Sequence, residues 1–418
     1  MAANIFTGTT NSNWGTATNW SLGSVPTASD GHVATFDASS PDCTVNASSR
    51  VCNAIDFTGY TNTISGDAAR TLTVSGNITL GAGMGDGGNI KLIQGLTNIT
   101  ITSNGYYWKG AFEDSGKNFT LADNMEVYDL IILATNVTIS GTQKIIVHNS
   151  WYQQAVLNAN GTTIEFNGTD VSSTHVYPET YTISACNLIL NISGTWTVKL
   201  AGAGKIMFIG GSFTQTSGTI FENYSSNYGF HFRNNTTVNI SQKLTTVAIG
   251  SVTINTELKA TTLYLNPVLT SGTFIIAGSE GFNVDNLYYI FPSYIEIFKL
   301  TSTKNYYVSS YFEYNGLTNV LVSTTATSAA NLILGASCVA YVFHGKFTDI
   351  DCSGGKALGV FKGILTRTTN ITSYNDLNYL SVLPAITDVK TGVTYSDARG
   401  TVFTGTLASG GGAMAIMT

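Results

Sequence analysis

The sequence predicts an all-β protein whose body is an elongated, β-solenoid-like stack of short strands. Strict alternation is the first observation behind this prediction, because a period of two puts apolar side chains on one face of a strand and Thr, Asn or Ser on the other. The clearest alternating runs are residues 71–75, 98–102, 136–140 and 251–255. Low charge is the second observation: charged residues make up 11% of the 418-residue chain, against roughly 25% in an average soluble domain. The 43% hydrophobic fraction still suffices for a large core.

Weak internal repeats are the third observation. The tripeptide Ser-Gly-Thr begins at Ser140, Ser193, Ser217 and Ser271, and the run Asn-Leu-Ile-Leu at 187–190 recurs at 331–334. Recurrent strand–turn–strand units of about 20–30 residues are typical of stacked solenoid coils. An array of β-sandwiches remains the alternative, because alternation alone does not distinguish parallel from antiparallel strands.

The chain divides into three zones, because its amino-acid composition and repeats change along the sequence. Residues 1–66, rich in Trp and Asn, are expected to form a small N-terminal β module that caps or docks the body. Residues 67–373 carry the repeats and predict the solenoid-like body, and residues 374–418 predict a distinct C-terminal structural or assembly segment. The best candidate for a helix is a short turn over 374–383, so we expect helix content far below the usual share.

The N-terminal module is expected to have its own small core. Trp14 and Trp20 are separated by an even number of residues, so in an extended segment they share one face. Together with Phe36 they are the predicted structural core of this module.

Several classes of function are disfavoured by charge and hydropathy. The net charge is −6 and no cluster of Lys or Arg occurs, so a nucleic-acid partner is not expected. No apolar run reaches the roughly 18 residues that a membrane-spanning helix needs. The first ten residues lack the basic and apolar regions of a signal peptide, which disfavours export.

Five cysteines are scattered over the chain, and no two of them form a CxxC pair. The expected state is therefore a set of buried free thiols made in a reducing compartment. A bridge between Cys43 and Cys52 is the one local alternative. The remaining three are Cys186, Cys338 and Cys352.

No catalytic, cofactor-binding or metal-ligating residue is predicted. Residues 83–88 match GxGxxG, but a strand-like run rather than a helix follows, so we expect a glycine turn. Asp349 and Asp351 share one face of a predicted strand, where a solvated edge is favoured over an acid–base pair or a calcium site. The five histidines show no zinc spacing.

Dense aromatic clusters are the remaining candidates for a functional surface. Tyr and Trp contribute much of the contact energy in protein interfaces, and the alternative is that these rings stack in the core. We consider subunit contact ahead of glycan binding. The candidate interface aromatics are Tyr106, Tyr107, Trp108, Tyr288, Tyr289, Tyr311 and Tyr314.

Both ends of the chain resemble known surface proteins. Residues 13–36 contain Asn-Trp-Gly, Asn-Trp-Ser, Gly-Ser-Val-Pro and a later Asp and Phe. This order of short motifs resembles the N-terminal sequence of many secreted bacterial β-solenoids and of tailed-bacteriophage virion proteins. Residues 52–80 are more similar to the bacteriophage proteins than to the secreted bacterial ones. Residues 388–395, followed by Gly-Thr-Leu at 405–407, resemble the DVRxGVxY…GTL ending of phage structural proteins, with Lys390 in place of the usual Arg.

This resemblance implies a structural virion protein displayed on the phage particle: a fibre, a spike or a capsid-decorating protein. The expected partners are other copies of the chain, in a homotrimer, and other virion proteins; the expected location is the particle surface after assembly in the host cytoplasm. We do not expect an enzyme. The alternatives are a tailspike-type protein that binds or degrades host-surface glycan, and a secreted bacterial adhesin.

Overall fold

The computed structural model divides the chain into two compact units, Met1–His231 and Phe232–Thr418. Side chains are described up to residue 288, apart from 174–181, 201–205, 271–275 and 277–278 and the backbone gaps below. Beyond residue 290 only the backbone of individual strands is described. The backbone before that point is described for residues 1–46, 48–95, 98–114, 118–133, 137–154, 156–175, 180–200, 205–223, 229–233, 235–265, 272–277 and 279–290.

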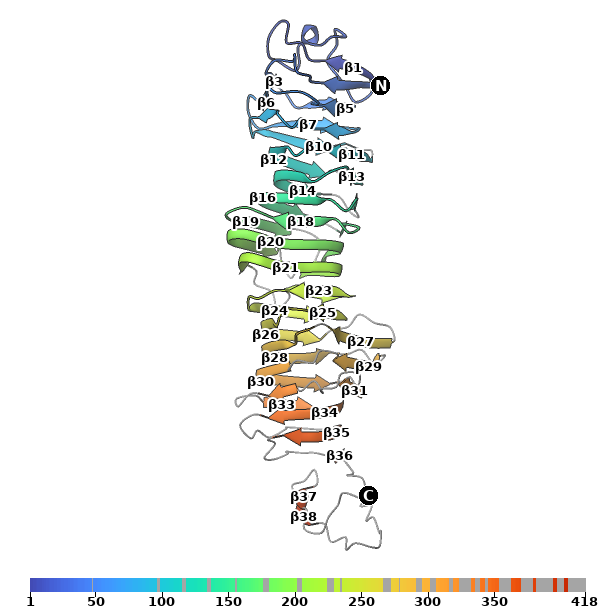
Figure 1. The fold of residues 1–418 in the computed structure, drawn as a ribbon, viewed down its shortest axis with the longest axis vertical. Coiled ribbons are helices and arrows are strands. Elements are labelled where there is room, and N and C mark those ends of the chain that lie inside the picture. Colours follow the sequence, from blue (N-terminus) through green and yellow to red (C-terminus); the bar gives the residue numbers. More distant parts are fainter. Residues whose placement is uncertain are drawn as a thin grey trace. The chain divides into compact units, whose positions relative to one another are not determined.

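The first unit is a stack of coils held together by three parallel ladders (Figure 1). Each coil adds one strand to a ladder, and side chains of successive coils lie in register. The first ladder is β1 (Ala2–Ile5), β2 (His32–Thr35), β5 (Ala54–Asp56), β8 (Ile78–Thr79), β11 (Ile99–Thr102), β13 (Phe119–Leu121), β15 (Val137–Ser140), β17 (Leu157–Asn158) and β20 (Thr180–Leu200). The second is β4 (Arg50–Cys52), β7 (Arg70–Val74), β10 (Ile90–Gln94), β12 (Tyr107–Asp114), β14 (Met125–Ile132), β16 (Lys144–Gln153), then β18 (Thr163–Phe166) beside β19 (Val171–His175), then β20 and β21 (Lys205–Asn223). The third is β3 (Cys43–Val45), β6 (Thr63–Gly66) and β9 (Gly85–Asp86).

The second unit is also built from parallel ladders, two in the described residues. Its strands also pair in parallel, apart from the antiparallel hairpin β37–β38. One ladder holds β22 (Phe230–Arg233), β24 (Leu244–Ile249), β26 (Leu258–Leu265), β28 (Phe282–Ile290), β30 (Tyr306–Asn315), β32 (Leu332–Leu334) beside β33 (Val339–Val342), β34 (Gly345–Cys352), β35 (Lys362–Thr369) and β36 (Tyr379–Leu380). The other holds β23 (Thr236–Asn239), β25 (Val252–Ile254), β27 (Gly272–Ala277), β29 (Ile295–Leu300) and β31 (Asn319–Val322), and the hairpin is β37 (Thr394–Ser396) with β38 (Val402–Thr404).

Parallel pairing confirms the predicted solenoid and excludes the sandwich alternative. The step from one coil to the next ranges from 16 residues, between Val247 and Leu263, to 30, between Ala2 and His32. This range includes the predicted repeat of about 20–30 residues. The described residues contain no α-helix, and η1 (Ala17–Asn19) is a single 3-10 turn.

Buried columns of apolar side chains explain why the alternating runs stack. Leu72, Leu92, Phe112, Leu130 and Trp151 lie opposite one another on five successive coils, and each is at most 1% exposed. In an in-register parallel ladder the apolar face of each coil covers that of its neighbour. The same alternation leaves Thr71 and Thr73 of β7, Lys91 of β10 and Glu126 of β14 on the outer face.

An aromatic cluster closes the beginning of the first unit. Trp14, Trp20 and Phe36 are at most 2% exposed, and their ring centroids lie 4.9–5.6 Å apart. Phe6 and Phe57 extend the cluster on either side of Phe36. Because β1, β2, β5 and β8 form one ladder, the predicted boundary at residue 66 lies within a continuous stack.

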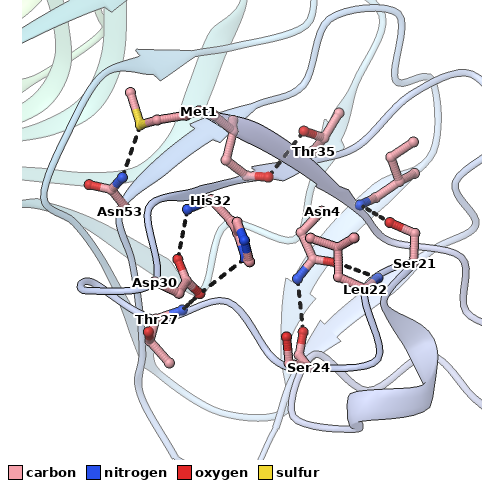
Figure 2. Close-up of polar contacts among 12 residues, drawn as sticks. Met1, Asn4, Ser21, Leu22, Ser24, Thr27, Asp30, His32, Thr35 and Asn53 are labelled. Atoms are coloured by element: carbon pink, nitrogen blue, oxygen red, sulfur yellow. Dashed lines mark hydrogen bonds and ion pairs between the residues drawn. The ribbon is translucent and has the colours of Figure 1, made fainter.

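Buried asparagines hold the loop that carries these tryptophans. Asn19 is 0% exposed; its side-chain oxygen accepts hydrogen bonds from the backbone of Thr10 and Asn11, and its amide donates to the Asn13 carbonyl. Asn4, also 0% exposed, donates to the Ser24 carbonyl and accepts from the Leu22 backbone (Figure 2). The Asn-Trp-Ser motif is therefore part of the framework of this loop.

Only three short strands of the C-terminal segment 374–418 are described. Tyr379 and Leu380 form β36, which pairs with β35, so the short helical turn expected over 374–383 is wrong at these two positions. The other residues of that turn, and the motif at 388–393, lie outside the described residues.

Candidate functional site

The outer surface of the first unit is most irregular where β-bulges interrupt the second ladder. The register shifts between Trp108 and Ala111, between Val127 and Asp129, and again on either side of Asn191. These shifts fall at equivalent levels of successive coils, because Trp108, Val127, Val147, Phe166 and Leu190 form one register row. Bulges turn side chains away from the regular alternation. We call the column that follows this row the corner; it consists of residues 109–110, 128, 148–149, 167–168, 191–194 and 216–218.

Glycines at the corner are required by close approach between coils. A Cβ atom on Gly168 would lie 2.2 Å from the carbonyl oxygen of His148. At Gly218, where φ is +84°, it would lie 2.4 Å from Cγ1 of Ile192. Only glycine fits such positions without displacing backbone or neighbouring side chains.

A chain of polar contacts crosses four strands beside the corner. Lys144 Nζ donates to Glu165 Oε2 at 2.9 Å, and Asn191 Nδ2 donates to Glu165 Oε1 at 3.0 Å. Ser217 Oγ then lies 3.2 Å from Asn191 Oδ1 and donates to the Ile192 carbonyl at 2.9 Å. Burial alone would raise the pKa of the Glu165 carboxyl, but the hydrogen bonds from Lys144 and Asn191 and the charge of Lys144 outweigh it and hold the pKa below its ordinary value.

An open groove of about 510 Å³ lies at the end of the corner formed by residues 167–168, 191–193 and 217–218. Its volume falls within the roughly 300–1,000 Å³ of small-molecule sites. No charged residue lines it; the lining residues are Asn167, Gly168, Asn191, Ile192, Ser193, Ser217 and Gly218.

A cluster with titratable groups occupies the preceding coils of the same corner. His148 Nε2 lies 2.6 Å from Glu126 Oε1, and the rings of His148 and Tyr107 have centroids 4.5 Å apart. Asp129 Oδ1 accepts hydrogen bonds from Asn149 and Ser150. Partial burial, followed by the negative charge of Glu126, raises the pKa of Tyr107. Acid, base and amide groups thus meet here, a combination that sequence spacing alone had not indicated.

The predicted aromatic cluster at 106–108 is divided between the inside and the outside of the coil. Tyr106 is 8% exposed and Trp108 1%, so these two rings lie inside and are unavailable as interface contacts. The Tyr106 hydroxyl donates to buried Asp86 at 2.7 Å. Tyr107, between them, points to the outer face beside His148. Alternation along a strand forces this division.

The other candidate aromatics fall partly outside the described side chains. Tyr288 is half-buried and stacks on Tyr264 of the preceding coil, with centroids 5.1 Å apart. Tyr289, Tyr311 and Tyr314 belong to β28 and β30, but their side chains lie outside the described residues.

The candidate sites for chemistry are placed as follows. Within residues 83–88, Gly83 belongs to a turn and Gly85–Asp86 form the short strand β9, so the expected glycine turn covers only part of this segment; strand β10, not a helix, follows. Asp349 and Asp351 lie on β34, opposite Arg367 and Thr369 of β35, and their side chains lie outside the described residues. Within the described part of the chain no group of three or more His, Cys, Asp or Glu residues could hold a metal ion. No described helix is long and apolar enough to cross a membrane.

The described cysteines are free and buried. Cys43 and Cys52, the pair considered for a bridge, are both 0% exposed and unbridged, and Cys186 is 1% exposed. Burial raises the pKa of all three thiols, to about 12 for Cys186.

Comparison of the chain with protein-family models, curated proteins and solved structures found no match.

Proposed function

We propose that this chain is a structural protein of a tailed-bacteriophage particle, displayed on the particle surface. The parallel ladder of stacked coils in the first unit is the observation that supports this most directly. Backbone hydrogen bonds and buried columns repeat from coil to coil there, a construction suited to a stiff surface element. The resemblance of both chain ends to virion proteins adds the phage context.

The surface chemistry is consistent with a structural role. Thr, Ser and Asn cover much of the outer faces, and these side chains lose little conformational entropy when they are ordered. Such a surface stays hydrated without many charges.

We propose further that the protein assembles with copies of itself, with three as the favoured number. Light scattering on the purified chain tests this, and the expected mass is three times that of the 44.3 kDa monomer. A stable monomer at micromolar concentration would count against the homotrimer while leaving the virion proposal open.

The position of the protein on an intact particle is the decisive test of the virion proposal. Particles purified from a lysate should contain the chain in a fixed copy number, and antibodies to the first unit should label the particle surface in electron microscopy. Particles that lack the chain altogether would refute the proposal.

An enzymatic tailspike is the alternative that requires its own test. Purified protein is incubated with capsular polysaccharide of a susceptible host, and new reducing ends are measured. We expect none. Release that disappears in Asp349→Asn or Asp351→Asn would replace the structural proposal with a glycan-cleaving one.

A further inference from the structure

We infer that the corner groove between Asn167 and Gly218 binds an uncharged, hydroxyl-rich ligand, namely a segment of neutral saccharide chain. This assigns a binding site to the first unit and does not depend on where the protein resides.

Two polar groups of the groove have their orientation fixed from behind. Glu165 is 7% exposed, and its carboxylate can only accept hydrogen bonds, so the amide nitrogen of Asn191 must face it. The side-chain oxygen of Asn191 consequently faces Ser217 Oγ at 3.2 Å, and the Ser217 hydroxyl is itself held by the Ile192 carbonyl at 2.9 Å. Lys144 fixes the opposite side of the carboxylate. Polar groups held in this way lose little further freedom when a ligand binds.

Two other polar groups of the groove are available to a ligand. Asn167 and Ser193 are exposed, and their side chains make no hydrogen bond with any described residue. The amide offers two donors and one acceptor oxygen, and the hydroxyl offers a donor and an acceptor. Sugar hydroxyls both donate and accept, so they match this mixed set.

The charge of the groove selects against anionic ligands. None of its lining residues is charged, Lys144 is paired with Glu165 at 2.9 Å, and the Asp170 carboxylate, which accepts the backbone N–H of Thr195, lies beside Gly194 at its edge. A polyanion needs unpaired cations to release its counterions. A neutral saccharide does not need such cations.

The corner also provides an aromatic surface for the apolar face of a sugar ring. Tyr128 is 42% exposed and precedes the groove by two coils, and the coil between them carries His148, whose backbone abuts Gly168. Two coils correspond to roughly 10 Å along the ladder. A saccharide chain lying along the corner can therefore contact both the ring and the groove.

A glycan array probed with the labelled full-length chain tests the assignment. The array carries neutral oligosaccharides of hexoses and N-acetylhexosamines, acidic oligosaccharides with uronic or sialic acids, and polyphosphate as an anionic control. We expect binding to at least one neutral structure and none to polyphosphate. Binding only to acidic probes, or to no probe at ligand concentrations up to about 10 mM, would overturn the inference.

Variants then locate the site, with the best neutral oligosaccharide titrated by calorimetry. Asn167→Ala should weaken binding about five- to tenfold, the effect of one lost hydrogen bond. Ser193→Gln, which fills the groove, should weaken it at least as much. Thr58→Ala, another exposed polar truncation far along the ladder from the groove, is the matched control and should bind like the parent.

Circular dichroism and melting temperature establish that each variant is folded. Affinities of Asn167→Ala and Ser193→Gln equal to that of the parent would place any saccharide site elsewhere and refute the assignment.

Discussion

The indole nitrogen of Trp20 donates a hydrogen bond to the backbone carbonyl of Trp14 at 2.8 Å, and the two rings meet edge to face with centroids 4.9 Å apart. This pair ties the 3-10 turn to the loop before it and covers the first coil. The stability of the N-terminal region should therefore depend on it.

Trp20→Ala should lower the free energy of unfolding by about 3–5 kcal/mol, as large aromatic truncations in cores do. The physical reason is loss of buried aromatic area together with the bond to Trp14. Urea denaturation followed by fluorescence measures it. Leu22→Ala is the control, since Leu22 is 47% exposed and should change stability by no more than about 0.5 kcal/mol. A parent-like midpoint for Trp20→Ala would contradict the buried cap.

Two nearby glycines should respond oppositely to alanine. A Cβ on Gly81 would lie 2.2 Å from the Phe57 carbonyl oxygen, whereas on Gly83 its nearest neighbour, Thr61 Cγ2, is 3.4 Å away. Gly81→Ala should destabilise by about 1–3 kcal/mol through overpacking. Gly83→Ala should be nearly neutral or slightly stabilising, because alanine restricts the unfolded chain. Thermal unfolding of both variants compares them, and equal effects would argue against the close coil contact.

Glu165 should make the first unit sensitive to acid. Its pKa in the folded state lies below the ordinary value of 4.5, so its contribution to stability is complete above that value and is lost as pH falls through the folded pKa. Urea unfolding from about pH 6 to about pH 3 should therefore show a smaller loss of stability in Glu165→Gln than in the parent.

Glu257→Gln is the control for this acid sensitivity. Glu257 pairs with Lys259 at 3.6 Å, and both side chains are 43% exposed, so the pair should contribute little. Identical pH profiles for the parent and Glu165→Gln would show that the Lys144–Glu165–Asn191 contacts do not stabilise the carboxylate.

The buried thiols should be unreactive in the native protein. Burial raises the pKa of Cys43, Cys52 and Cys186, so little thiolate exists at about pH 8. In a Cys338→Ser/Cys352→Ser variant, an aromatic disulfide reagent should label no thiol until denaturant is added, and then three. Rapid labelling without denaturant would indicate local opening, and two missing thiols after unfolding would indicate a Cys43–Cys52 bridge.

The candidate site shows which side-chain contacts spacing in the sequence can predict and which it cannot. Lys144, Glu165 and Asn191 meet across three coils although they are 21 and 26 residues apart. The coil length varies along the chain, so no fixed period identifies these partners. At 106–108 the structure places Tyr106 and Trp108 in the core, the alternative that the sequence left open, because alternation predicts two faces but does not say which one is buried.

The sequence by itself determined the strand character and the alternation of apolar and polar faces, because a period of two and β-branched residues act locally on each segment. It predicted stacked coils but left an array of β-sandwiches open. The tertiary structure alone decided which coils lie opposite one another, where bulges turn the chain at the corner, and which polar groups meet there. Those outcomes depend on loop lengths and close backbone contacts, such as Gly168 against His148, which involve residues distant in sequence.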